Sequence, residues 1–303
     1  MSQAGRAGRE AVKPALLTLA RRELTGAAKL ERGALVIAAV SGGPDSMALL
    51  HVLARLAPKL GFVVHAHGVD HGLRVEASRE LDIVESFAAH VGVPFARTRV
   101  RVAAGGNLQA RARAARYEAL AEAARAASAR TIATAHHTDD RAETVLIRLM
   151  RGAGPRGLAV LPPRAPLAVG GTDSGPALEL VRPFIRARRD CIRAHAERHA
   201  IPFVTDPSNA DPRFLRVRVR RDLMPLLEEL APGIVDHLVA LADQLADLRG
   251  EGPALFPLSR SSQVALAALV RSRSTTARVW LPGGLVVTHG PTARPGRGGG
   301  TEG

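Results

Sequence analysis

Cysteine, aromatic side chains and acidic residues are all in short supply in this chain. Cys191 is the single cysteine among 303 residues, so the sequence excludes an intramolecular disulfide, a dithiol redox pair and a cysteine-rich zinc site. Such a composition is typical of the reducing cytosol. Aromatic residues make up 3% of the chain and hydrophobic residues 46%, which predicts a globular core built mainly of aliphatic side chains.

Long apolar runs are also missing. A membrane-spanning helix needs about 20 apolar residues, and runs such as "ALVIAAV" at residues 34–40 are far shorter. Residues 1–30 are basic but hold no apolar stretch of the length found in secretion signals. The sequence therefore predicts a cytoplasmic protein that does not act at a membrane.

The acidic residues are too few to balance the basic ones. The chain holds 42 Lys and Arg against 28 Asp and Glu, a formal net charge of +14. Residues 182–221 carry 11 arginines and four acidic residues, so half of the excess charge falls in that segment. Strongly basic proteins commonly bind a polyanion, which favours nucleic acid as a partner. The alternative is a solvated basic surface that only keeps the protein soluble.

Strand-like and helix-like patterns alternate through the first half of the chain. The strand patterns cover residues 34–40, 61–67, 94–100 and 131–135, and the helix patterns cover residues 46–57, 78–91, 108–129 and 138–151. This alternation predicts an α/β fold with a doubly wound, mostly parallel sheet. We expect Asn107 to cap the third helix. Beyond these patterns we expect a loop over residues 152–178, a last strand over residues 178–185 and basic helices from residue 187, with Pro225 kinking or restarting one of them.

Changes in composition divide the chain into four predicted parts. A basic N-terminal extension covers residues 1–30, and the α/β domain covers residues 31–190. A smaller, basic α-helical subdomain follows at residues 191–290. The last part, residues 291–303, is rich in glycine and of low complexity, and we expect it to be disordered.

The stretch "SGGPDS" joins the first predicted strand to the first predicted helix. A loop in this position presents free N–H groups at the positive end of the helix dipole. Glycines let a phosphate approach the backbone, and serine hydroxyls can donate hydrogen bonds to it. Asp45 would repel a phosphate unless it binds Mg²⁺ or a donor group beside the phosphates. We therefore predict an ATP-phosphate loop with Asp45 as its magnesium ligand, formed by Ser41, Gly42, Gly43, Pro44, Asp45 and Ser46. The alternative is a glycine-rich turn capped by serine.

Three carboxylates cluster where the fourth predicted helix begins. Asp139, Asp140 and Glu143 follow the strand at residues 131–135, with Thr138 as the expected N-cap. Like charges at this spacing repel, so they need a reason to be there. Because the helix follows a strand, its start lies at the same sheet edge as the phosphate loop. Carboxylates at that edge can hold Mg²⁺ or the ammonium group of an amine substrate. The alternative is an acidic first turn that only suits the helix dipole.

These two stretches together resemble one known family. "SGGPDS" resembles the PP-loop of the N-type ATP pyrophosphatases, which cleave ATP between the α and β phosphates. With "ATAHHTDDRAETVLIRLMRG" at residues 133–152, the chain resembles the tRNA(Ile)-lysidine synthetases, as do residues 69–74, 112–120 and 206–232. The chain departs from the family pattern at Arg141, where the family has Gln, and at "RVRVR", which lacks the usual Asn.

The resemblance implies a reaction and a set of site residues. ATP adenylates the C2 oxygen of the wobble cytidine in an isoleucine tRNA with a CAU anticodon. The amine of free L-lysine then attacks C2, so that AMP and diphosphate are the by-products. The implied catalytic residues are Asp45, Asp140 and Glu143. The candidate substrate-binding residues are His136, Asp139, Arg113, Arg116, Arg216, Arg218 and Arg220. For His136 core packing is the alternative, and for Arg113 and Arg116 it is the solvated face of a helix. ATP and Mg²⁺ are the expected cofactors, and we also consider a homodimer.

Two other functions compete with this interpretation. A tRNA thiolase of the PP-loop superfamily would generally need more cysteines than Cys191 alone. A non-enzymatic basic RNA-binding protein that retains a nucleotide-responsive fold is the candidate from another class. A zinc site at His65, His67 and His71 is disfavoured because no regular spacing supplies further ligands. Release of diphosphate from ATP that depends on both tRNA and lysine would separate the three functions.

Overall fold

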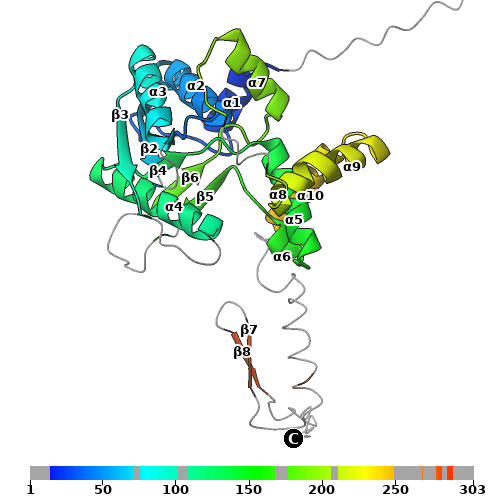
Figure 1. Ribbon diagram of the computed structural model, residues 1–303. Coiled ribbons are helices and arrows are strands. Elements are labelled where there is room, and N and C mark those ends of the chain that lie inside the picture. Colours follow the sequence, from blue (N-terminus) through cyan, green and yellow to red (C-terminus); the bar gives the residue numbers. More distant parts are fainter. Residues whose placement is uncertain are drawn as a thin grey trace, which may run out of the picture.

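Figure 1 shows the arrangement of helices and strands in the computed structural model of the protein. The structure describes residues 14–70, 72, 76–101, 108–167, 169, 177–205, 211–248, 268, 278–281 and 285–288. The predicted cap Asn107 and the predicted disordered tail at residues 291–303 lie outside these residues. Among the helices in the described ranges, none is long and apolar enough to cross a bilayer.

The centre of the molecule is a six-stranded sheet with strand order β3-β2-β1-β4-β6-β5. Its strands are β1 (Leu35–Ala39), β2 (Val63–Asp70), β3 (Phe95–Arg99), β4 (Thr131–Ala133), β5 (Arg164–Leu167) and β6 (Leu178–Val181). Every neighbouring pair runs parallel except β5 and β6, which are antiparallel. The predicted α/β class with a mostly parallel sheet is thus confirmed.

Helices cover both faces of this sheet, as a doubly wound fold requires. Residues of a strand alternate between the faces. Val36 and Ala38 of β1 face one core and Ile37 faces the other. The second core is closed by α4 (Leu108–Ala126). The first core is closed by α1 (Leu16–Thr25), α2 (Pro44–Leu60), α3 (Glu76–His90) and α7 (Arg189–Arg198).

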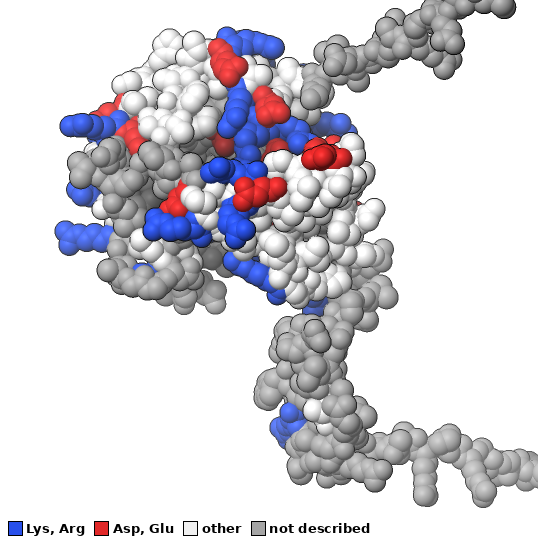
Figure 2. Space-filling model, turned by 45° about the vertical axis from the view of Figure 1, so that its right-hand side comes forward, with Lys and Arg blue, Asp and Glu red and all other residues white. Residues whose placement is uncertain are grey.

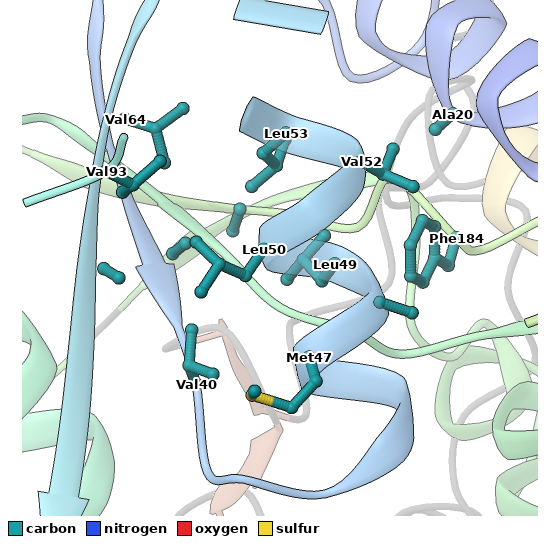
Figure 3. Packing of buried hydrophobic residues seen from close by; sticks show 14 of the residues in the cluster. Ala20, Val40, Met47, Leu49, Leu50, Val52, Leu53, Val64, Val93 and Phe184 are labelled. Atoms are coloured by element: carbon teal, nitrogen blue, oxygen red, sulfur yellow. The ribbon is translucent and has the colours of Figure 1, made fainter. Parts of the chain in front are cut away.

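Helix α2, which begins at the predicted phosphate loop, is the most deeply buried of these helices. Its Leu49, Leu50 and Leu53 are fully buried. Figure 3 shows that Val52 lies on the side of α2 nearer to Ala20 and Phe184, while Leu50 lies on the side of β1. The helix ends at Gly61, whose φ of 78° lies in the left-handed region that favours glycine. Packing on both sides therefore fixes the position of the loop at its start.

The predicted loop over residues 152–178 is wrong in part, because it contains regular structure. The short helix α6 (Pro155–Leu158) follows α5 (Thr138–Met150), and β5 then adds an antiparallel edge to β6. The glycines and prolines of this segment are typical of loops, so β5 could not be predicted from the sequence. Pro166 lies within β5, and proline is tolerated there because an edge strand leaves N–H groups that no neighbour needs.

The basic segment after β6 forms helices, as predicted. A continuous helical stretch consists of α8 (Leu215–Arg218), the π-helical turn η2 (Val219–Leu223) and α9 (Met224–Leu230), and α10 (Ile234–Asp247) follows it. The change from π-helical to α-helical structure occurs next to Pro225, which cannot donate a helical hydrogen bond. Apolar residues of α10, η2 and α6 pack with Val145 and Leu146 of α5 in a third core.

A separate pair of strands, β7 (Arg278–Leu281) and β8 (Leu285–Thr288), forms a two-stranded antiparallel sheet. The four predicted parts of the chain stay a prediction. Within the first of them, α1 contributes Leu16, Ala20 and Leu24 to the core around α2.

Candidate active site

The loop between β1 and α2 is held open by its own residues. Gly42 has a φ of +83°, a conformation that favours glycine. Ser46 Oγ donates to the carbonyl oxygen of Gly43 at 2.9 Å and accepts from the N–H of Ser41 at 3.1 Å. Pro44 occupies the first turn of α2, where a missing N–H costs nothing. A Cβ added to Gly43 would meet nothing closer than 3.8 Å, so a phosphate can approach the backbone there.

This loop lies at the point where the strand order reverses. β1 and β4 are neighbours in the sheet. The chain continues from β1 to β2 on one side of this pair and from β4 toward β6 and β5 on the other side. Open α/β sheets bind ligands in the crevice at such a point. The segment after β4 reaches the loop there, since His137 Nε2 lies 3.8 Å from Asp45 Oδ2. The two stretches that the sequence singled out therefore meet in the structure.

Asp45 is the only carboxylate in the loop. Its side chain is 36% exposed, and among the described residues its one ion-pair partner is His137. Burial raises the pKa of Asp45 above its usual 3.8, and the charge of Asp140 adds to that, whereas His137 opposes it. A carboxylate with a raised pKa and no arginine bound to it can accept a cation.

The first turn of α5 is capped by His137 and not by Thr138, so the predicted cap is corrected. The Asp140 N–H donates to His137 Nδ1 at 3.4 Å, and the His137 N–H donates to Asp140 Oδ2 at 3.3 Å. Thr138 already lies inside the helix, where its hydroxyl donates to the Ile185 carbonyl. Burial lowers the pKa of the His137 ring, but the hydrogen bond to Asp139 and the charges of Asp140 and Asp45 outweigh it, so that the pKa is raised.

Asp139 and Asp140 are each bound by arginines from other elements. The Arg189 N–H donates to Asp139 Oδ2 at 2.8 Å, and Arg188 Nε donates to Asp139 Oδ1 at 3.2 Å. Arg216 Nη2 donates to Asp140 Oδ1 at 3.1 Å. Burial would raise the pKa of both carboxyls, but hydrogen bonds from His137 and Arg189 hold that of Asp139 below its usual value, and the charges of His137 and Arg216 do so for Asp140.

Glu143 is the most enclosed carboxylate of the cluster, with a side chain only 2% exposed. It accepts hydrogen bonds from Arg189 Nη2 at 2.9 Å, Arg216 Nε at 2.9 Å and Arg220 Nε at 2.7 Å. Burial would raise the pKa of Glu143, but the hydrogen bond and charge of Arg220 and the charge of Arg216 keep it low. The carboxylate thus stays ionised and joins α5, α7, α8 and η2.

A second cationic cluster lies at the α4 side of the same region. The guanidinium groups of Arg113 and Arg116 lie 5.1 and 5.3 Å from the centre of the Tyr117 ring. Burial lowers the pKa of His136, Asp140 opposes this, and the charges of Arg182, Arg116 and Arg113 add to it, so that the pKa is about 3 and the ring is neutral. In the described part of the chain, no ion pair joins these three arginines to a carboxylate, so the cluster favours an anion.

Arg218 is the predicted residue that the structure leaves apart from the site. Its side chain is 67% exposed and faces Asp222 of the same helical stretch at 3.8 Å. Sequence reasoning also missed Arg188 and Arg189. The signal was present, because cations at the start of a helix oppose its dipole unless a carboxylate neutralises them. Figure 2 shows basic and acidic side chains lying next to one another across the middle of one face of the molecule.

The residues at this edge fit a magnesium ion that is shared with a substrate. In the ranges that the structure describes, no three His, Cys, Asp or Glu residues converge to form a complete metal site. Mg²⁺ at phosphate sites is held by one or two carboxylates together with the substrate's own phosphates. Asp45, which is half-buried and adjoins the loop, offers such a partial site. When bound there, the ion would neutralise charge on the phosphates.

Comparison with known proteins connects this site to a family. The family model described as "PP-loop domain" matches residues 16–227. The chain is 41% identical over 257 residues to a tRNA(Ile)-lysidine synthase of Methylobacterium nodulans, and the match covers 83% of this chain and 68% of that protein. It is 39% identical to a tRNA(Ile)-lysidine synthase of Symbiobacterium thermophilum, with 82% and 50% covered, and 42% identical to one of Salinispora arenicola, with 70% and 62% covered. The chain therefore spans between half and about two thirds of the length of several curated relatives.

A solved structure shows the same fold. The U34-tRNA thiolase NcsA from Methanococcus maripaludis superposes with a TM-score of 0.62, covering 81% of this chain and 83% of that one. The two sequences are 20% identical, so this likeness concerns the arrangement of strands and helices alone.

Proposed function

The chain belongs to the PP-loop family of tRNA(Ile)-lysidine synthases, and from that premise we propose that it ligates free L-lysine to C2 of the wobble cytidine of an isoleucine tRNA with a CAU anticodon. The reaction consumes ATP and yields AMP and diphosphate. The observation that carries the proposal is the meeting of two sites at one sheet edge, where Asp45 of the loop and His137 before α5 lie 3.8 Å apart.

The phosphate loop would bind ATP and orient it for attack by the cytidine oxygen. The N–H groups of the first turn of α2 point at the ligand, and the helix dipole favours its negative charge. Asp45 would hold Mg²⁺ against the phosphates, and Ser41 and Ser46 would offer hydroxyl groups. Attack on the α-phosphorus forms the bond to the C2 oxygen and breaks the bond to diphosphate.

The α5 carboxylates would hold the amine that completes the reaction. An ammonium group carries one positive charge and up to three donors, which matches the oxygens of Asp140 and Glu143. In the structure those oxygens accept from Arg216 and Arg220. Lysine binding would therefore require these guanidinium groups to share or yield part of their contacts. The neutral ring of His136 lies close by as a further polar contact for the substrate.

The cluster of Arg113, Arg116 and Arg182 would receive negative charge from the tRNA or from the nucleotide. All three lie near His136, at the side of α4. Arg182 is 4% exposed, and Arg116 Nε has no hydrogen-bond partner within the part of the chain that the structure describes, so a bound anion would offset the cost of burying these groups. Arginine binds phosphate with paired donors, which suits this position.

The test is mass spectrometry of the anticodon fragment after incubation of the protein with isoleucine tRNA, ATP and lysine. We expect a mass increase of one lysine residue at the wobble cytidine, and none when ATP or lysine is left out. A gain of sulfur on the tRNA would favour the thiolase. Binding of tRNA with no turnover of ATP would favour a non-enzymatic RNA-binding protein, and either result would overturn the proposal.

A further inference from the structure

A second ion-pair network lies behind the candidate active site, on the opposite side of α5. Arg141 comes directly after Asp140 in sequence, but its side chain points away from the site and is fully buried. Its Nε donates to the Val160 carbonyl at 2.9 Å, and its Nη1 lies 2.6 Å from Asp243 Oδ1 on α10. Arg141 is also where this chain departs from the Gln of the family pattern, so the network was not visible from the resemblance.

Asp243 binds a second arginine from another part of the chain. Arg186 Nη1 donates to Asp243 Oδ2, so each carboxylate oxygen faces one guanidinium group. Glu23 of α1 is buried among the same charges, with Arg186, Asp243 and Arg141 acting on its carboxyl group. Arg22 acts on Glu23 as well, and burial raises the pKa of Glu23, so Asp243 is the carboxylate that pairs directly with both Arg141 and Arg186. Without the charge of Asp243, the guanidinium groups of Arg141 and Arg186 would lose their shared carboxylate. The charge of the fully buried Arg141 would then be uncompensated, which is destabilising.

Arg186 belongs to a segment in which other residues donate hydrogen bonds to the active-site carboxylates of α5. We call residues 185–189, which lie between β6 and α7 and include the first residue of α7, the clamp segment. Its backbone accepts from Thr138 at the start of α5, through the carbonyl oxygens of Ile185 at 3.1 Å and Ala187 at 2.9 Å. Its last two residues, Arg188 and Arg189, are those that bind Asp139 and Glu143.

We propose that Asp243 is a positioning residue that fixes α5 and the clamp segment against each other, and thereby sets the geometry of the carboxylates that receive the amine substrate. It does so through two contacts, one to Arg141 on α5 and one to Arg186 in the clamp segment. This inference rests on the proposed function for the identity of the amine as lysine. The role of α10 in positioning the carboxylates does not depend on which amine binds there.

The test compares two variants of one helix. Asp243→Asn keeps the size of the side chain and removes its charge, and Asp247→Asn makes the same change one turn later at an exposed position. We expect Asp243→Asn to raise the KM for lysine about tenfold or more. A displacement of about 1 Å in the groups that position a substrate is enough for an effect of this size. Binding of ATP, measured without lysine, should change less than twofold. Asp247→Asn should match the wild type in both.

A measurement that needs no activity accompanies the kinetics. Hydrogen exchange of the amides at residues 138–143 should be faster in Asp243→Asn than in Asp247→Asn, because the start of α5 loses its support. If the wild type ligates no lysine, the proposed function fails and exchange alone decides on the positioning role. If Asp243→Asn does not fold, Arg186→Gln removes the half-exposed partner and should show the same changes to a smaller degree. Unchanged exchange together with an unchanged KM would overturn the inference.

Discussion

Two carboxylates of the candidate site, Asp45 and Glu143, lie in opposite electrostatic surroundings. Asp45 has a side chain that is 36% exposed and no bound arginine among the described residues, and burial raises its pKa. Glu143 has a side chain that is 2% exposed and three bound arginines, and despite its burial its pKa is lowered. The sequence presents both as acidic residues in the first two turns of a helix.

This difference indicates that Asp45 is available to bind a cation, whereas Glu143 also stabilises the structure of the site. Among the described residues Asp45 forms an ion pair only with His137, and Arg189 and Arg220 act on it without contact, so a metal ion or a proton can compensate its charge. Glu143 is compensated by Arg189, Arg216 and Arg220, which belong to three elements. Neutralising Asp45 should affect turnover alone, and neutralising Glu143 should affect the stability of the fold as well.

The largest effect is expected from Asp45→Asn. Formation of AMP should fall by about 100- to 1,000-fold, because one preorganised electrostatic contact to the reacting phosphates is removed. The free energy of unfolding should stay equal or rise slightly, since a half-buried charge is replaced by a neutral side chain. Single-turnover kinetics and thermal unfolding measure the two quantities. Asp190→Asn, in the exposed first turn of α7, is the matched control.

Glu143→Gln should produce the complementary pattern. It removes the carboxylate that Arg189 Nη2 binds and leaves Arg216 and Arg220 with Asp140 alone. We expect the free energy of unfolding to fall by about 2 kcal/mol, less than for a fully buried pair because the arginines reach solvent. Affinity for lysine should fall as well, while tRNA affinity should not, because removing an acid cannot weaken binding to a polyanion by charge. Denaturant unfolding is compared with Glu197→Gln, an exposed residue of α7. Equal stabilities of the two variants would contradict the contrast between Asp45 and Glu143.

The pH dependence should separate the two carboxylates without mutation. The pKa of Asp45 is raised above 3.8, so this group takes up a proton first as the pH falls and loses its hold on a cation. The pKa of Glu143 is lowered below 4.5, so its contribution to stability is complete above pH 4.5 and is lost only as the pH falls through the lower folded value. Diphosphate formation should therefore decline at a higher pH than lysine affinity or stability. A simultaneous decline would show that one group controls both.

Sequence reasoning predicted the parts of the fold and site that depend on local patterns. The loop at residues 41–46 could be found because its glycines, serines and aspartate lie next to one another, between a strand and a helix. The start of α5 could be found for the same reason, and sheet topology brought the two together. The roles of individual residues in this site stay predictions until they are tested.

The rest could not be predicted because it depends on contacts across long stretches of sequence. Arg216 and Arg220 were singled out as phosphate-binding cations, yet the structure gives them Glu143 as a partner, more than 70 residues away. A run of arginines does not reveal which of its members face a carboxylate after folding. β5 was missed because its pairing with β6 outweighs the poor strand propensity of its proline.

The smallest effect is expected from Arg218→Gln, which tests the basic surface apart from the network around Glu143. Arg218 is 67% exposed and, among the described residues, pairs only with Asp222, at 3.8 Å, so it can bind a tRNA phosphate without disturbing the site. Loss of one phosphate contact should make the log–log dependence of tRNA affinity on salt shallower by about 0.7 to 0.9. The KM for lysine should not change. Arg216→Gln should instead raise that KM, because Arg216 contacts both Asp140 and Glu143. Filter binding of isoleucine tRNA across a salt series measures the slope, and a slope equal to that of the wild type would assign Arg218 to a merely solvated surface.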